Sequence, residues 1–173
     1  MTARNTTPSP LTHPGGIARH GAAIYDSPEH DPYQVKHKYT EPTVCKDCGA
    51  VFHRGRWQWG TAPAEAHRAL CPACHRVRDG LPAGTVTLEG GFIAHHREEL
   101  LGIVRNQEKR AKAEHPLQRI IAVEEDANRI VVTTTDVHLP RRIGEALKDA
   151  HQGELDIRFG DSEYSVQVDW KRW

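Results

Sequence analysis

The sequence predicts an α+β fold, because two kinds of pattern follow one another along its 173 residues. Four cysteines in two C-x-x-C pairs fall in the first half of the chain. From residue 85 onward, apolar residues switch repeatedly between the spacing of a strand and the spacing of a helix, in the order β-α-β-β-α-β-β. We therefore expect a cysteine module, residues 41–82, followed by a C-terminal α+β domain, residues 83–173.

Residues 1–40 precede both parts and have a different composition. They contain five prolines among many polar residues, without apolar periodicity, and we expect a disordered tail. The first 20 residues lack the apolar stretch of a signal peptide. No apolar run in the chain approaches the roughly 20 residues of a membrane span.

The two cysteine pairs have the spacing of metal ligands. Cys45 and Cys48 form the first pair, Cys71 and Cys74 the second, and the chain has no other cysteine. Each pair is short enough for both thiolates to reach one ion, and two pairs complete the tetrahedral sulfur shell that Zn²⁺ prefers. Such a closed shell leaves no position for water or substrate, so the sequence predicts a structural zinc site in a reducing, cytoplasmic setting.

Other uses of the cysteines fit the sequence less well. Two disulfides would suit a secreted protein, and a thioredoxin-like motif would leave one pair unexplained. The zinc deaminase pattern needs H-x-E and P-C-x-x-C, whereas His67 is followed by Arg-Ala and Leu70 precedes Cys71. His53, His67 and His75 flank the pairs and remain as alternative ligands.

Between the pairs, the sequence predicts a strand and a helix. Trp57 and Trp59 alternate with Gln58, so both indoles would lie on one side of a strand. There they would either pack over the metal site as a small core or form a platform for stacking bases. Residues 62–70 have the composition of a helix, and Gly49 follows the first pair where a turn needs positive φ.

The C-terminal domain is expected to contain two helices and five strands. Helices are predicted over 92–113 and 137–151, the second capped by Asp136, and strands over 85–88, 119–123, 130–134, 155–159 and 164–170. This is the ferredoxin-like split βαβ order with one added strand, and we expect both helices on one face of an antiparallel sheet. The expected core is Leu100, Val104, Ile121, Val131, Ile143, Leu147, Leu155, Ile157, Val166 and Val168.

Charge is distributed unevenly, although the formal net charge is zero. Residues 36–78 hold eight Lys and Arg against three acids, whereas residues 79–173 hold thirteen basic and seventeen acidic residues. A basic RNA-binding face on the cysteine module is one interpretation, and an ordinary solvated surface is the other. Arg141 and Arg142, at the N-terminus of the helix predicted over 137–151, would add a phosphate contact. The candidate RNA-binding residues are Lys46, Arg54, Arg56, Trp57, Trp59, Arg76, Arg78, Arg141 and Arg142.

Three stretches are similar to one known family. They are His115-Pro116-Leu117 with Arg119-Ile120; Thr133-Thr134-Thr135-Asp136 with His138-Leu139, Arg141-Arg142-Ile143-Gly144 and Ala146-Leu147; and Gly153-Glu154-Leu155 with Trp170. With the paired cysteines, they resemble bacterial relatives of the eukaryotic and archaeal large-ribosomal-subunit export adaptor, named for nonsense-mediated decay. The resemblance spans about residues 42–170. It implies a zinc-ribbon protein without catalytic activity that docks on ribosomal RNA or the large subunit.

The chain also departs from that family. Eukaryotic members have more C-x-x-C pairs, and they also have β-barrel domains and export signals. The resemblance therefore does not imply nuclear export for this chain. What it implies is contact with the ribosome, in subunit maturation or dormancy. The alternative is a protein–protein interaction module in stress or transcriptional regulation, with the acidic C-terminal domain facing the protein partner. An enzyme with a small-molecule substrate is not expected: H-E-x-x-H, a P-loop and G-x-G-x-x-G are absent, and His95-His96 lacks the i, i+4 spacing of metal ligands.

Overall fold

The structure is a computed structural model that describes residues 33, 39–161 and 164–173. The tail expected over residues 1–40 therefore lies outside the described residues, apart from Tyr33, Tyr39 and Thr40. None of the helices in the described part of the chain combines the length and the apolar character that crossing a bilayer requires.

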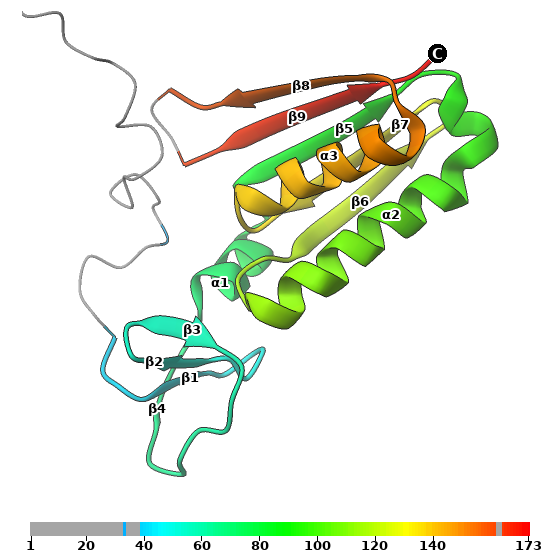
Figure 1. The fold of residues 1–173 in the computed structure, drawn as a ribbon. Helices are drawn as coiled ribbons and strands as arrows, with labels where there is room; N and C mark the ends of the chain where they lie inside the picture. Colours follow the sequence, from blue (N-terminus) through cyan, green and yellow to red (C-terminus); the bar gives the residue numbers. More distant parts are fainter. Residues whose placement is uncertain (1–32, 34–38, 162–163) are drawn as a thin grey trace, which may run out of the picture.

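The cysteine module is a sheet of four short strands followed by one helix (Figure 1). The strands are β1 Thr43–Cys45, β2 Val51–His53, β3 Arg56–Gln58 and β4 His67–Ala69, and they lie in the order β3-β2-β1-β4. β2 is antiparallel to both β1 and β3, whereas β4 is parallel to β1. The helix α1, Pro72–Asp79, lies between this sheet and the C-terminal domain.

The prediction of a helix over residues 62–70 is wrong. Residues 67–69 form strand β4, because pairing with β1 satisfies their backbone groups and outweighs a helix propensity of a few tenths of a kcal/mol per residue. The helix begins later, at Pro72, whose missing N–H costs nothing in the first turn. It ends at Gly80, which takes the left-handed φ of 63° that glycine adopts without strain.

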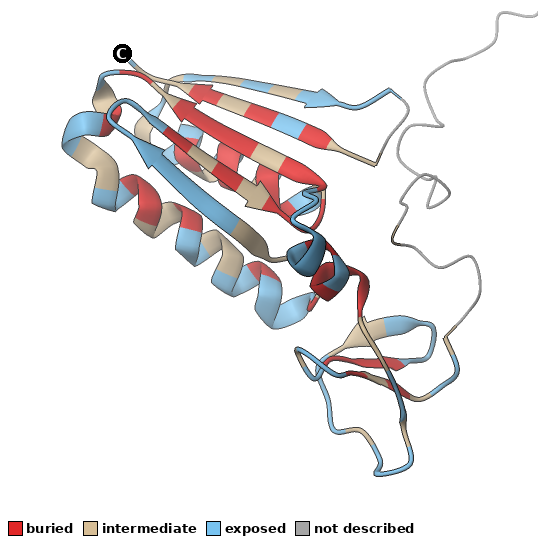
Figure 2. Cartoon of the chain, turned by 180° about the vertical axis from the view of Figure 1, so that it is seen from behind, coloured by how far each residue is buried: buried red, intermediate tan, exposed pale blue. Residues whose placement is uncertain are grey.

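The C-terminal domain is a five-stranded sheet with both long helices on one face. The strands are β5 Gly84–Glu89, β6 Ile120–Asp126, β7 Arg129–Thr134, β8 Glu154–Phe159 and β9 Val166–Lys171. The helices are α2 Phe92–Glu114 and α3 His138–His151. Viewed from behind in Figure 2, the opposite face of the sheet has no helix across it, and buried residues alternate with less buried ones along β7 and β9.

The elements follow one another as predicted, but the sheet is not antiparallel. Its order is β6-β7-β5-β9-β8, and β9 runs parallel to β5. The structure therefore corrects the antiparallel expectation and does not confirm a ferredoxin-like strand order, because β9 is inserted between β5 and β8. The burial pattern explains the placement: β9 buries Val166, Val168 and Trp170, whereas β8 has no fully buried side chain and forms an edge.

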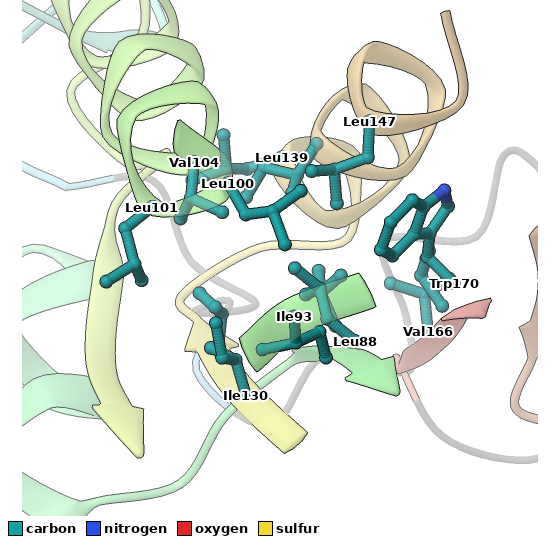
Figure 3. Close-up of a cluster of buried hydrophobic side chains, with 14 of the residues drawn as sticks. Leu88, Ile93, Leu100, Leu101, Val104, Ile130, Leu139, Leu147, Val166 and Trp170 are labelled. Atoms are coloured by element: carbon teal, nitrogen blue, oxygen red, sulfur yellow. The ribbon is translucent and has the colours of Figure 1, made fainter. Parts of the chain in front are cut away.

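One apolar core lies between this sheet and the two helices (Figure 3). Of the expected core, Leu100, Val104, Ile143, Leu147 and Val168 are fully buried, and Val166 nearly so. The other four are only partly buried, and the reasons are local: Val131 alternates with Ile130 and Val132, which face the core, and the rest lie on edge strands. Those edge-strand residues are Ile121, Leu155 and Ile157.

Candidate metal centre

The four cysteines converge on one point of the cysteine module. Their sulfur atoms all lie within 4.8 Å of one another. The Sγ atoms of Cys45 and Cys74 are 3.6 Å apart, and those of Cys48 and Cys71 are 3.8 Å apart. A tetrahedral ion with metal–sulfur bonds of about 2.3 Å would hold its sulfurs about 3.8 Å apart. The cysteines are all free thiols, so the cluster has the dimensions of a metal site and not of a disulfide.

The first pair is positioned by a tight turn at the end of β1. The amide of Cys45 donates to the carbonyl of Ala50 at 2.7 Å, and the amide of Gly49 donates to the carbonyl of Cys45 at 3.0 Å. Gly49 has a φ of 78°, as the sequence predicted for this position. The turn directs the thiols of Cys45 and Cys48 to the same side.

The second pair is positioned by the start of α1. Cys71 is the N-cap residue, and its sulfur accepts a hydrogen bond from the amide of Cys74 at 3.4 Å. The amide of Cys71 donates to the sulfur of Cys45 at 3.3 Å. Strand β4, pairing in parallel with β1, delivers Cys71 to this position. Strand β4 and helix α1, which the sequence did not predict, are therefore the elements that place Cys71 and Cys74 beside the first pair.

Burial and hydrogen bonds act in opposite directions on these thiols. Burial raises the pKa of the Cys71 thiol and that of the Cys48 thiol. Burial also raises the pKa of Cys45, but backbone N–H groups, led by that of Cys48, lower it more, to about 7. The surroundings therefore favour the thiolate of Cys45, whereas burial disfavours the thiolates of Cys48 and Cys71.

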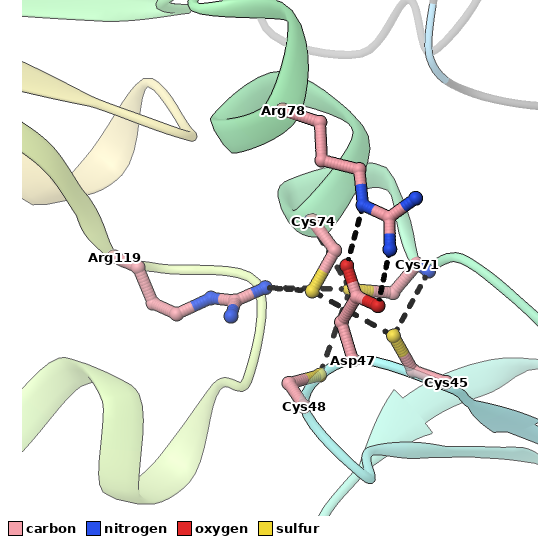
Figure 4. A network of polar contacts seen from close by, with 7 residues as sticks. All are labelled: Cys45, Asp47, Cys48, Cys71, Cys74, Arg78 and Arg119. Atoms are coloured by element: carbon pink, nitrogen blue, oxygen red, sulfur yellow. Dashed lines mark hydrogen bonds and ion pairs between the residues drawn. The ribbon is translucent and has the colours of Figure 1, made fainter.

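Two arginines border the cluster (Figure 4). Arg119, which precedes β6, donates from one terminal nitrogen to the sulfurs of Cys71 at 3.3 Å and Cys74 at 3.2 Å. Arg78, on α1, makes a bidentate ion pair with Asp47 at 2.7 and 2.6 Å. Of these two arginines, Arg119 is the one that donates to the sulfur atoms.

The alternative histidine ligands are not part of the group. His53, His67 and His75 are exposed, and the metal-binding group found among the described residues contains cysteines alone. On α2, His96 lies 3.1 Å from the carboxylate of Glu99, three residues later, which is an ordinary helix-surface contact. The donor set is thus four sulfurs, which suits a soft ion such as Zn²⁺.

Three of the candidate RNA-binding residues make contacts within the chain, and of these only Arg78 is exposed. Arg76 is 3% exposed and donates to the carbonyl of Leu81 at 3.1 Å. Arg78 is occupied by Asp47. Trp57 is half-buried against the rings of Tyr39 and Phe52, as the small-core interpretation predicts.

The exposed cations of the module do not form one continuous face. Lys46, Arg54 and Arg56 are exposed and make no ion pair within the described part of the chain. The β1–β2 register places Lys46 beside the metal end of these strands, whereas Arg54 lies in the turn at the other end. There Glu41 accepts hydrogen bonds from the amides of Arg54 and Gly55, and holds the turn.

Trp59 is brought next to a second group of cations, which sequence spacing did not reveal. It is 39% exposed, and its indole N–H donates to the carbonyl of Lys112 at 2.6 Å, in the last turn of α2. Arg105, Lys109 and Lys112 are exposed and follow one another at helical spacings of four and three residues, so they line one face of α2.

The start of α3 offers less to a phosphate than the sequence suggested. Arg141 is exposed and pairs with Glu145 at 2.8 Å, and Arg142 is partly buried. The carboxylate of Asp136 accepts from the amides of His138 and Leu139, so two N–H groups of the helix start are already bonded.

Comparisons with known protein families, with curated proteins and with solved structures find no match to this chain. The interpretation of the site therefore depends on its own residues.

Proposed function

We propose that the chain is a zinc-binding protein without catalytic activity, whose cysteine module and the adjoining end of α2 bind ribosomal RNA of the large subunit. The observation on which this depends most is the position of Trp59. An exposed aromatic ring beside exposed cations is the arrangement that binds single-stranded RNA, because bases stack on the ring while phosphates pair with the charges.

The cysteine cluster supports zinc in a structural role. Four thiolates would fill its coordination, so no open position would be left for water or substrate. Zinc would fix β1, β4 and α1 relative to one another and thereby position the hairpin that contains Arg54 and Arg56. Thiolate ligands persist in a reducing compartment, and we therefore expect the protein to act in the cytoplasm.

Charge supports RNA as the partner. The exposed cations that would face it are Arg54 and Arg56 on the β2–β3 hairpin, with Lys109 and Lys112 on α2. Two acids of the module already have partners: Glu41 accepts from the amides of the hairpin turn, and Asp47, at the metal end, pairs with Arg78. The ribosomal target is supported by the family resemblance of about residues 42–170, and subunit maturation or dormancy is the role that it suggests.

Sucrose-gradient sedimentation of a tagged copy, with and without RNase, tests this proposal. The tagged chain should sediment with the large subunit and lose that association after RNase treatment. If about four phosphates are contacted, affinity should fall roughly 50- to 150-fold between 50 and 200 mM salt. Capture of a partner that resists RNase would instead support the protein-interaction alternative and contradict the RNA proposal.

Matched variants locate the surface. Arg54→Glu combined with Arg56→Glu should abolish association, and Lys112→Glu should weaken it, with metal content unchanged. Trp59→Ala should cost about 1–3 kcal/mol of binding free energy. Lys148→Glu is the control, because Lys148 is also an exposed lysine in the last turn of a helix, α3, and should have no effect. Equal sedimentation of all variants would refute this surface.

A further inference from the structure

The C-terminal domain reaches the cysteine cluster through one short segment, Leu117–Arg119, which we call the strap. Arg119 donates to the sulfurs of Cys71 and Cys74, and Leu117 packs against the same cluster of buried residues. The strap follows α2 and precedes β6, so it belongs to the C-terminal domain by sequence.

The strap is fixed to its own domain by hydrogen bonds that do not involve the cysteine module. Thr135, which follows β7, takes part in several of them. Its hydroxyl donates to the carbonyl of Leu117 at 2.6 Å and accepts from the amide of Arg119 at 3.0 Å, and its amide donates to the carbonyl of Arg119 at 2.9 Å. The carboxylate of Glu108 accepts from the amide of Ile120 at 2.8 Å. The C-terminal domain therefore sets where the Arg119 guanidinium lies.

The sulfur atoms are the counter-charge of this guanidinium. Arg119 is partly buried and has no ion pair with a carboxylate among the described residues, and its Nε has no hydrogen-bond partner there. When a divalent ion holds four thiolates, the cluster has a formal charge of −2, which attracts the guanidinium. Without the metal, no ion joins the two cysteine pairs, so the sulfurs of Cys71 and Cys74 are no longer held where the guanidinium reaches them.

We infer that Arg119 is a positioning residue that makes docking of the C-terminal domain on the cysteine module depend on the bound metal. The inference rests on the metal-binding part of the proposed function and not on RNA binding. Because linkage is reciprocal, the metal strengthens docking and docking strengthens metal binding by the same factor. The contact of Trp59 with Lys112 crosses the same interface, so removing the metal also separates the two halves of the proposed RNA surface.

Three variants of the full-length protein test this inference. Arg119→Met retains the length of the side chain and removes its charge and donors, whereas Arg119→Lys keeps the charge with a different donor geometry. Arg97→Met is the matched control, because Arg97 donates three hydrogen bonds, to Glu125, Asp126 and Ala127, at the far end of α2 from the strap. Metal content is measured first, followed by Zn²⁺ affinity in competition with a chromogenic chelator.

Arg119→Met should bind Zn²⁺ about 10- to 100-fold more weakly, as expected for loss of a group that hydrogen-bonds to metal ligands. Arg119→Lys should lie between this variant and wild type, and Arg97→Met should bind Zn²⁺ like wild type. The charge-transfer band of the Co²⁺-substituted protein should shift in Arg119→Met, because the N–H···S hydrogen bonds withdraw electron density from the sulfurs. Loss of remote packing alone would leave that band in place.

Amide hydrogen exchange measures docking directly. In wild type, removal of the metal should increase exchange in residues 115–120 because docking is lost, and in residues 57–60 because the module also unfolds, while β5 and β7 stay protected. In Arg119→Met, exchange in both segments should be increased even with the metal bound. If Arg119→Met does not fold, the same comparisons are made with Arg119→Lys, for which a several-fold loss of Zn²⁺ affinity is expected.

The two proposals fail in different ways. Wild-type protein that binds no metal would refute the metal centre itself. Protein that binds Zn²⁺ with the same affinity and the same strap protection in wild type and Arg119 variants would overturn the role of Arg119 and leave the metal centre standing.

Discussion

Replacing Cys71 with serine should release the metal and unfold the cysteine module while the C-terminal domain stays folded. Cys71 is fully buried, caps α1 and accepts hydrogen bonds from Cys74 and Arg119, so its sulfur connects the metal, the helix and the strap. A serine hydroxyl is a poor ligand for a soft ion and lies too far from the other sulfurs to replace the thiolate.

The size of the effect follows from how little apolar surface the module buries. Its largest buried apolar side chains are Val51 and Phe52, at 5% and 7% exposure, whereas the largest fully buried side chains, such as Trp170 and Leu88, belong to the C-terminal domain. Burial of Val51 and Phe52 contributes about 1.5–3 kcal/mol each. A structural zinc ion contributes about 10–16 kcal/mol. The metal therefore stabilises the module more than the burial of these two side chains does, and the module should not fold without it.

Elemental analysis and amide hydrogen exchange test this expectation together. Cys71→Ser should contain less than one metal ion per chain, with β1 and β2 unprotected and β5, β7 and β9 protected as in wild type. Ala64→Ser serves as the control, because it adds a hydroxyl at an exposed position of the same module. A Cys71→Ser protein with one ion per chain and protected β1 and β2 amides would refute the reasoning.

Two further predictions concern the C-terminal domain. Leu147→Ala, at a fully buried position, should lower the free energy of unfolding by about 2–5 kcal/mol in urea titrations, and a loss no larger than that of the exposed Lys148→Ala would contradict the assigned core. For Asp136, burial raises the pKa above its ordinary value of 3.8, so its charge costs stability above the folded-state pKa, and this cost declines as the pH falls from that value toward 3.8. Asp136→Asn should therefore be at least as stable as wild type at pH 7 and lose this advantage at low pH, whereas Asp136→Ala, which loses both amide contacts, should be less stable at pH 7 by about 0.5–2 kcal/mol. Thermal unfolding across pH checks both variants, and an Asp136→Asn protein as unstable as Asp136→Ala would show that the charge itself is favourable.

The C-terminal elements could be predicted because their apolar periodicities are long and their ends have clear signals. Pro116 follows α2, Asp136 precedes α3, and both helices begin and end within a few residues of the expected positions. The sheet order could not be predicted, because periodicity indicates which face of a strand is buried and not which neighbour it pairs with. Both β8 and β9 alternate apolar with polar residues, so their sequence patterns do not indicate which of the two is central.

The cysteine group could be predicted from spacing alone, but its surroundings could not. Ligands three residues apart are brought together by a local turn, which a sequence pattern can indicate. Arg119, by contrast, is 45 and 48 residues away from the cysteines that it contacts, and Trp59 is 53 residues away from Lys112. The start of α1 could have been found, since proline at the first helical position and Gly80 after the last turn are both visible in the sequence. The number of basic residues in the cysteine module overstates the charge available to a partner, because the sequence does not show that Asp47 forms an ion pair with Arg78.

The parallel pairing of β5 with β9 has a consequence for how the C-terminal domain folds. Gly84 lies opposite Val166, so this pairing closes a loop of about 80 residues, and the entropy of loop closure grows with length. The β6–β7 hairpin, joined by Ala127 and Asn128, closes over far fewer residues and can form first. Until β9 arrives, one side of β5 has no neighbour and the pocket for the Trp170 indole is incomplete. Docking of that indole, whose N–H donates to the carbonyl of Gln152, should therefore be the slowest step of folding and give a late fluorescence signal.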